Sequence, residues 1–183
     1  CTIYNEKSGK IIIEKETLPD GSTHDFEFDP SWSETNFRLS DGESQNSDWL
    51  MPDVYSISEF TGEAWDLTSL ACASADGGVT LDLENAMVTV DLDPGETVTC
   101  AFTNTQRGNI QACKYEDVNG NGNKDSEDFA FNNVHMILYK YDGENWIEVE
   151  DGSTQENGCV TFTNFEPGSY KVEEDYTDPD LIG

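Results

Sequence analysis

Apolar residues along this chain occur in short alternating or β-branched runs rather than at helical spacing. No long window places apolar residues at i, i+3, i+4 and i+7, the pattern that predicts an amphipathic helix. Segments rich in β-branched and aromatic residues predict strands at 11–13, 26–28, 54–57, 79–83, 87–92, 98–102, 134–141, 146–149, 160–162 and 170–172. Turn sequences such as Asp41-Gly42 and Asp142-Gly143 separate them. Regular short strands of this kind predict an all-β fold of Ig-like sandwiches.

The chain also repeats itself. Residues 1–11 align with residues 100–110 at an offset of 99, with Cys, Asn, Gly and Ile coinciding, and the same offset carries Lys15 onto Lys114. A second matching pair follows, because Tyr55-x-x-x-Glu59 resembles Tyr170-x-x-x-Glu174. The repeat therefore predicts two related modules in tandem.

Strand order within the repeat predicts an unusual division of the chain. Residues 10–108 form one complete sandwich, and residues 109–183 form a second that lacks its closing strand. Residues 1–9 are then a closing strand with no module ahead of it. Either the sequence is a window from a longer tandem array, or strand 1–9 completes the second module of a neighbouring subunit by donor-strand complementation. Repeated head to tail, the second arrangement gives an open filament.

Composition narrows the function classes. The chain has 183 residues, with 38 acidic and 9 basic side chains and a formal charge of −29. No positive surface is available to neutralise phosphates, which excludes nucleic-acid binding. No stretch has the apolar length of a membrane-spanning helix. Five scattered cysteines without a zinc-type spacing favour disulfides and an oxidising, extracellular compartment, with buried free thiols as the alternative.

One loop has the spacing of a calcium ligand set. Segment 117–128 carries oxygen-bearing side chains at loop positions 1, 3, 5 and 9 and a glycine at position 6, as in an EF-hand loop. The expected ligands are Asp117, Asn119, Asn121, Asn123 through its carbonyl, Asp125 and Asp128. Asp128 stands where the bidentate Glu is usual, and no helices flank the loop. The calcium would be structural; the alternative is an Asn/Gly-rich turn without metal.

These motifs resemble two kinds of surface-protein domain. Module one resembles the prealbumin-like, collagen-adhesin B-type domains of bacterial and archaeal surface proteins and pili, through segments 11–15, 55–59, 64–67 and 98–104. Module two resembles the calcium-binding B-type repeats of serine-aspartate surface adhesins, through segments 113–122, 157–162 and 167–170. The resemblance implies a secreted β-sandwich stalk without enzymatic turnover.

The resemblance also implies an internal covalent cross-link. Similar domains join a lysine of the first strand to an asparagine of the last strand through an isopeptide bond, and a buried glutamate assists. The matching residues in module one are Lys15, Asn104 and Glu59. A Lys15–Glu59 ion pair or a surface lysine is the alternative. Module two has Lys114 and Glu174, and Asn5 would be the third member if strand 1–9 were donated to it.

Module membership suggests how the cysteines pair. Cys72 and Cys100 lie in module one, and Cys113 and Cys159 lie in module two, so each pair is expected to form one disulfide. Four cysteines allow three pairings, and module logic alone selects this one. By the repeat, Cys1 corresponds to Cys100, and its partner is expected in a preceding or neighbouring module.

The sequence thus predicts a structural module of an extracellular cell-surface protein or filament, with copies of itself or adjacent modules as partners. Calcium, disulfides and isopeptide bonds would make it rigid. The alternative is an adhesin module that binds a host, matrix or carbohydrate ligand, which an exposed aromatic cluster would favour.

Overall fold

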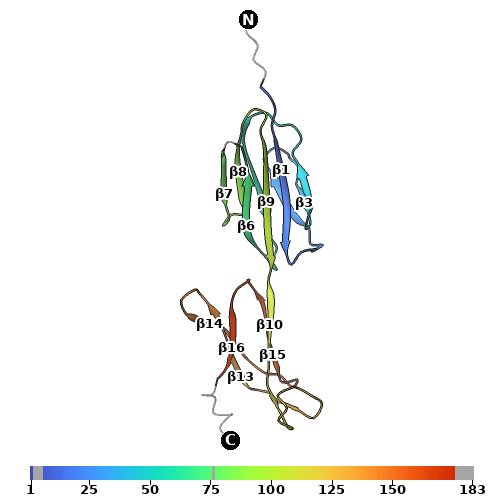
Figure 1. The fold of residues 1–183 in the computed structure, drawn as a ribbon, viewed down its shortest axis with the longest axis vertical. Coiled ribbons are helices and arrows are strands. Elements are labelled where there is room, and N and C mark those ends of the chain that lie inside the picture. The colour runs from blue at the N-terminus through green and yellow to red at the C-terminus, as the bar shows by residue number, and fades with distance from the viewer. Residues whose placement is uncertain (2–5, 76, 176–183) are drawn as a thin grey trace. The chain divides into compact units, whose positions relative to one another are not determined.

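The computed structural model describes residues 1, 6–75 and 77–175. The chain divides into two compact units, Cys1–Gln106 and Arg107–Gly183 (Figure 1). Every regular element among the described residues is a strand, which confirms the all-β prediction. No helix in this part of the chain is long and apolar enough to cross a membrane.

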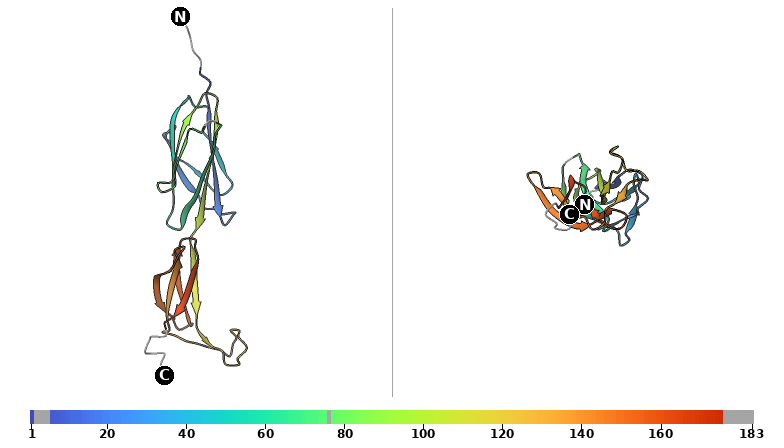
Figure 2. Two further views of the ribbon diagram at one scale, coloured as in Figure 1. Left: turned by 60° about the vertical axis from the view of Figure 1, so that its left-hand side comes forward. Right: turned by 90° about the horizontal axis from the view of Figure 1, so that it is seen from below.

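The first unit is a sandwich of two sheets. One sheet has the order β4-β1-β9-β6, formed by β4 (Ser44–Asn46), β1 (Lys10–Leu18), β9 (Thr97–Gln106) and β6 (Trp65–Ala73). The other has the order β3-β2-β5-β8-β7, formed by β3 (Phe37–Leu39), β2 (Phe26–Pro30), β5 (Asp53–Phe60), β8 (Met87–Leu92) and β7 (Val79–Asp82). The first and last strands, β1 in blue and β9 in yellow-green, run parallel (Figure 2). The other strand pairs are antiparallel.

Alternation along the strands builds the core of the first unit. Residues at every second position of β1 and β9 are buried, because successive side chains of a strand point to opposite faces. The rings of Phe28 on β2 and Phe102 on β9 meet edge to face with centroids 5.2 Å apart. The same alternation turns Lys15 and Thr17 inward behind Ile11 and Ile13.

The second unit is smaller. It contains the three-stranded sheet β14-β13-β16, formed by β14 (Trp146–Ser153), β13 (His135–Tyr141) and β16 (Tyr170–Glu174). It also contains two two-stranded sheets, formed by β10 (Gly108–Cys113) with β15 (Cys159–Phe165) and by β11 (Tyr115–Glu116) with β12 (Phe129–Ala130). Its buried apolar cluster is limited to Val134, Met136, Leu138 and Phe162.

Strands β10, β13, β14, β15 and β16 pair with one another as β1 to β5 do. The registers also agree. Ile12 pairs with Asn46, and Gln111, which lies 99 residues after Ile12, pairs with Thr161. The described part of the second unit thus corresponds to the first five strands of the first unit. No counterpart of β6, β7, β8 or β9 is found among the described residues of the second unit. That only the closing strand of this module is lacking stays a prediction.

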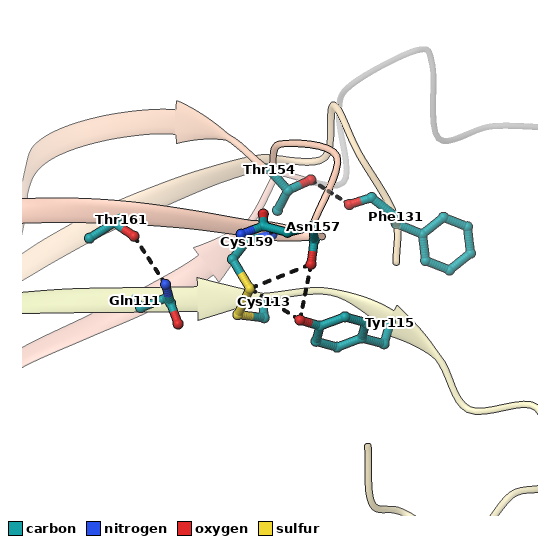
Figure 3. Close-up of a disulfide and its surroundings, with 8 residues drawn as sticks. All are labelled: Gln111, Cys113, Tyr115, Phe131, Thr154, Asn157, Cys159 and Thr161. Carbon is teal, nitrogen blue, oxygen red and sulfur yellow. Dashed lines mark hydrogen bonds between the residues drawn. A yellow bond between two sulfur atoms is a disulfide. The ribbon is translucent and has the colours of Figure 1, made fainter. Parts of the chain in front are cut away.

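Two disulfides join neighbouring strands within the units. Cys72 on β6 bonds to Cys100 on β9, and Cys113 on β10 bonds to Cys159 on β15. These are the pairings that module membership predicts. Figure 3 shows the second disulfide, beside which the Tyr115 hydroxyl donates to the Asn157 carbonyl at 3.1 Å. Cys1 is exposed and carries a free thiol.

The predicted closing strand 1–9 is described only in part, because residues 2–5, Asn5 among them, lie outside the described residues. Its last residues contact the first unit: Gly9 forms an antiparallel bridge with Leu50, and the Gly95 amide donates to the Lys7 carbonyl at 2.9 Å. A Cβ atom at Gly9 would lie 2.9 Å from the Glu96 carbonyl oxygen, so a larger residue cannot take this place without a shift of backbone.

Candidate functional site

Three polar side chains meet inside the apolar core of the first unit. Lys15 follows Ile13 on the inward face of β1, Glu59 follows Ile57 on β5, and Asn104 follows Phe102 on β9. Strands β1 and β9 are neighbours in one sheet, and β5 belongs to the other. The side chains of Lys15 and Glu59 are fully buried, and Asn104 is 0% exposed. The period of the strands therefore places an amine, an acid and an amide together between the sheets.

The lysine amine contacts both partners. Lys15 Nζ donates to Asn104 Oδ1 at 2.9 Å and lies 3.5 Å from Glu59 Oε1. It also donates to the Phe102 carbonyl at 3.0 Å and lies 4.2 Å from the centroid of the Phe26 ring. The amine is thus held against the side-chain amide of Asn104 by contacts on several sides.

Burial acts on both ionisable groups of the site. It lowers the pKa of Lys15, an effect that the nearby Glu59 carboxylate only partly opposes. It raises the pKa of Glu59, with Lys15 acting in the opposite direction. Loss of water disfavours the charged form of each group, so the pair shifts toward a neutral amine and a neutral acid.

Some polar atoms of the site have no hydrogen-bond partner. Both carboxylate oxygens of Glu59 and the Asn104 Nδ2 atom are buried without a hydrogen bond. Buried polar groups are paired in nearly all proteins, and each unpaired group costs about 1–3 kcal/mol. The site thus contains a nucleophile (Lys15), an amide carbon (Asn104) and an acid (Glu59). Its hydrogen bonds leave several buried polar atoms without a partner.

The second unit holds a related pair. Lys114 Nζ lies 2.7 Å from Glu174 Oε2, and their side chains are 39% and 12% exposed. Glu174 pairs with Met136 in the register in which Glu59 pairs with Phe28. The structure therefore brings Lys114 and Glu174 together, while the third predicted member, Asn5, lies outside the described residues.

The predicted calcium loop connects β11 to β12. Both carboxylate oxygens of Asp117 accept hydrogen bonds, one from the Asn121 amide at 3.1 Å and the other from the Gly122 amide at 2.7 Å. Gly120 and Gly122 have positive φ values of 70° and 76°, a conformation that glycine adopts without strain. The glycines thus make the sharp turn that the sequence pattern predicts.

The remaining predicted ligands close the loop on itself. The Asp125 carboxylate accepts hydrogen bonds from the side-chain amides of Asn119 at 2.8 Å and Asn121 at 2.9 Å, and the Asp128 carboxylate accepts from the Asp125 amide at 2.8 Å. The Asn123 amide donates to Asn121 Oδ1 at 2.7 Å. Among the described residues, no three His, Cys, Asp or Glu side chains are grouped as a metal site.

A histidine between two acids was not evident from the sequence motifs. His135 Nε2 lies 2.9 Å from Asp151 Oδ2, and its Nδ1 lies 3.3 Å from Asp175 Oδ2. Hydrogen bonds to Asp151 first, and to Asp175 second, raise the pKa of His135. The sequence signal would be that these three side chains lie on the same outward-facing side of neighbouring strands. This can be seen only once the strand registers are known.

Aromatic side chains gather on the outer face of the second unit. The rings of Tyr141 and Trp146 have centroids 5.2 Å apart, and both residues are exposed. Lys171 Nζ lies 4.9 Å from the centroid of Tyr139 and 5.1 Å from that of Trp146. An exposed aromatic cluster of this kind is the feature that would favour the alternative function, a ligand-binding adhesin module.

Comparison with known families gives two matches. Residues 11–106 and residues 119–179 each match the description of a prealbumin-like fold domain. The first match covers more than half of the chain. Prealbumin-like pilin and adhesin domains are structural, non-enzymatic and surface-exposed. The particular similarity of the second module to calcium-binding serine-aspartate repeats stays a prediction.

Several solved structures of low sequence identity also match the chain. They include the Bacillus anthracis TIE protein (21% identity, TM-score 0.38, covering 92% of this chain and 28% of that one). A Mobiluncus mulieris adhesin with intramolecular disulfide, isopeptide and ester bond cross-links also matches (18% identity, TM-score 0.39, covering 56% and 42%). A third is the streptococcal ancillary pilin (12% identity, TM-score 0.37, covering 92% and 53%). The chain spans about half or less of each of these proteins. No curated protein matches it.

Proposed function

Because this chain belongs to the family of prealbumin-like fold domains, we propose that it is a structural module of an extracellular cell-surface protein or filament, joined end to end with adjacent modules or copies of itself. The observation that carries the proposal is the buried group of Lys15, Glu59 and Asn104. An isopeptide bond between Lys15 and Asn104 would tie the first strand of the unit to its last. Such a bond suits a stalk that carries load, because it links β1 and β9 directly.

The chemistry of this bond follows from the geometry. The neutral amine of Lys15 attacks the Cγ atom of Asn104, a new N–C bond forms, the Cγ–Nδ2 bond breaks, and ammonia leaves. Protonated Glu59 polarises the amide and transfers a proton from the attacking nitrogen to the leaving one. Burial supports both roles, because it favours the neutral amine and the neutral acid.

Intact-mass measurement tests the bond. We expect the purified chain to be lighter than its sequence mass by one ammonia, about 17 Da. Glu59→Gln should abolish the mass loss while it keeps the shape of the side chain. Lys10→Arg is the matched control, since Lys10 lies on the same strand with its Nζ 4.4 Å from the Trp49 ring, away from the site. An unshifted mass in the folded wild-type chain would refute the cross-link.

Calcium in the loop 117–128 is a further part of the proposal. Its support is the all-oxygen donor set of Asp117, Asn119, Asn121, Asp125 and Asp128, and hard oxygen ligands are those that calcium prefers. Asn123 would contribute its backbone carbonyl. The ion would offset part of the negative charge of Asp117, Asp125 and Asp128 and fix the segment that connects β11 to β12.

Titration calorimetry with calcium tests this part. We expect binding that stabilises the second unit by about 2.7 kcal/mol once calcium exceeds its Kd a hundredfold. Asp117→Ala should abolish binding, because it removes the carboxylate around which the loop turns. Glu156→Ala is the matched control, since it removes an exposed acid of the same unit that lies outside the loop. Absence of binding heat and of stabilisation in the wild-type chain would leave the loop as an Asn/Gly-rich turn.

A second candidate function is adhesion to a carbohydrate. The observation that favours it is the exposed pair Tyr141 and Trp146 beside Lys171, since aromatic faces with a polar neighbour suit sugar rings. A glycan array tests it: retention that Trp146→Ala abolishes would support adhesion, and no retention by the wild-type chain would exclude it for the arrayed sugars.

A further inference from the structure

A cavity opens on one side of the first unit, between the edges of its two sheets. β3, labelled in Figure 1, is the edge strand of one sheet, and β4 is the edge strand of the other. The cavity has a volume of about 370 Å³ and is lined by residues between 30 and 37 and by residues 45–48. Cavities that bind small molecules usually measure about 300–1,000 Å³. This one is therefore large enough for a small molecule or for the end of a larger one.

Part of the lining is apolar and aromatic. Trp32, just after β2, and Phe37, at the start of β3, line the cavity together with Pro30. The Trp32 ring meets that of Tyr55 edge to face with centroids 6.2 Å apart, and the Phe37 ring stacks on that of Phe28 at 5.3 Å. These contacts hold both half-buried rings in place, so the aromatic wall is formed before any ligand arrives.

The part of the lining that comes from β4 and the turn after it is polar. Gln45, Asn46 and Asp48 are exposed there. Asn46 Oδ1 accepts a hydrogen bond from the Asp48 amide at 3.0 Å, and Asp48 has a φ value of 60°. The Ser47 hydroxyl accepts a hydrogen bond from the Ile11 amide at 2.9 Å, which ties this turn to β1. Among the described residues, none donates a hydrogen bond to the Asp48 carboxylate, so both of its oxygens are available to a ligand.

The charge of the lining restricts the class of ligand. Within the described part of the chain, Asp48 is the one charged side chain that lines the cavity, and no lysine or arginine lies there. A phosphate, sulfate or carboxylate would meet this acid without a cation to pair with, and the net charge of −29 adds to the repulsion. A wholly apolar ligand would leave the amides and the carboxylate without partners. The lining thus favours a neutral ligand that has both an apolar face and several hydroxyl groups.

A sugar ring has this combination of groups. Its C–H groups form an apolar face that packs on aromatic rings, and its hydroxyls donate to a carboxylate and exchange hydrogen bonds with amides. An added peptide strand fits less well, because β3 and β4 have three residues each and such short edges offer few backbone groups for pairing.

We propose that this cavity binds a neutral hexose or N-acetylhexosamine residue of a glycan. The apolar face of the sugar packs against Trp32 and Phe37, its hydroxyls donate to the Asp48 carboxylate, and the amides of Gln45 and Asn46 bind its remaining polar groups. This inference goes beyond the structural role proposed above and does not depend on the cross-link or on calcium. The site belongs to the first unit and is distinct from the exposed aromatic pair of the second.

NMR titration of the isotope-labelled 183-residue chain tests the site. The neutral probes are the methyl glycosides of glucose, galactose and mannose, together with N-acetylglucosamine and N-acetylgalactosamine, and sialic acid is the acidic probe. We expect at least one neutral sugar, at millimolar concentration, to shift the indole resonance of Trp32 and the side-chain amide resonances of Gln45 and Asn46. Sialic acid should leave these resonances in place. Trp32→Phe identifies the indole resonance by its loss.

Two variants change the site itself. Asp48→Asn removes the carboxylate and keeps the turn, since asparagine also adopts positive φ values readily. It should weaken sugar binding about tenfold, because hydrogen bonds to a charged acceptor are stronger than those to a neutral one. Trp32→Ala should abolish binding. Because Asp48 is exposed, its variant keeps the test decisive even if Trp32→Ala fails to fold.

Two further variants are matched controls. Asp29→Asn removes an exposed acid of β2 that lies between the buried Phe28 and Pro30 and faces solvent. Trp146→Ala removes an exposed aromatic residue of the second unit. Both proteins should bind the sugar as the wild-type chain does.

Several results would overturn the inference. They are no shift with any of the neutral sugars, unchanged affinity in Asp48→Asn, tighter binding of sialic acid than of the neutral sugars, or binding that Trp146→Ala abolishes. The cross-link and calcium binding are measured separately by mass and calorimetry, so their failure would leave this site standing, and its failure would leave them standing.

Discussion

The two units hold the same lysine–glutamate pair at different depths. Lys15 and Glu59 are sealed between two sheets, whereas Lys114 is 39% exposed beside Glu174. Their strands follow the same order and register, so the difference comes from β9, which covers the pair in the first unit and supplies Asn104. The comparison indicates that the closing strand has two effects: it brings the amide, and it removes the water that keeps amine and acid charged.

The units also differ in what stabilises them. The first has a core of thirteen buried hydrophobic residues drawn from both sheets, and the described part of the second has four. Each has one disulfide. A small apolar core supplies little stability by itself, so a covalent link contributes a larger share in the second unit.

The largest expected effect is that of preventing the proposed cross-link in the first unit. Asn104→Ala removes the amide and leaves an 89-residue connection between β1 and β9 open. Chain-entropy estimates give about 4.6 kcal/mol for closing a loop of that size. We expect chemical denaturation to show the first unit destabilised by about that amount and the second unchanged.

Two comparisons sharpen this prediction. Lys15→Met also prevents the bond and leaves the buried Glu59 without its partner, so it should destabilise at least as much as Asn104→Ala. Thr105→Ala, one residue further along β9 on its other face, is the control and should change stability little. Equal stability of Asn104→Ala and wild type would show that the bond is absent or carries no load.

Reduction of the disulfides is expected to affect the stability of the two units differently. Removing the bridge between Cys72 and Cys100, or that between Cys113 and Cys159, should cost about 3 kcal/mol in each case. The first unit keeps its larger core, while the second loses most of its stability. Hydrogen exchange in the presence of a reductant measures this: amides of β13 should lose protection, and those of β1 should keep it. Simultaneous loss in both units would contradict the comparison.

The family resemblance implies which three residues form the first site, and the alternation of residues agrees with it. Lys15 shares a face with Ile13, Glu59 with Ile57, and Asn104 with Phe102, so the pattern turns all three inward. The contact between Lys15 and the Phe26 ring could not be predicted, because it depends on how the two sheets face each other.

The second unit was harder to predict. The repeat identifies Lys114 and Glu174. Which strands of the first unit have counterparts among the described strands of the second becomes clear only from the strand pairing. The contact between His135 and Asp151 was hidden for a related reason. β13 and β14 shift register between Leu138 and Tyr139, and such a bulge changes which residues face each other.

The smallest expected effect is a pH dependence of the second unit. Hydrogen bonds to Asp151 first, and to Asp175 second, raise the pKa of His135 above the ordinary value near 6.5. The folded state therefore binds this proton more tightly than the unfolded state does. The stabilisation is fully present below about pH 6.5 and is lost as pH rises through the folded pKa.

Thermal unfolding of wild type and His135→Gln between pH 5 and pH 9 measures this contribution. The wild-type advantage should shrink as pH rises, and it should be modest because the pair with Asp151 is partly exposed. The first unit has no part in the contact and should respond equally in both proteins. A difference in stability between the two proteins that stays constant with pH would mean that His135 acts through packing rather than through its charge.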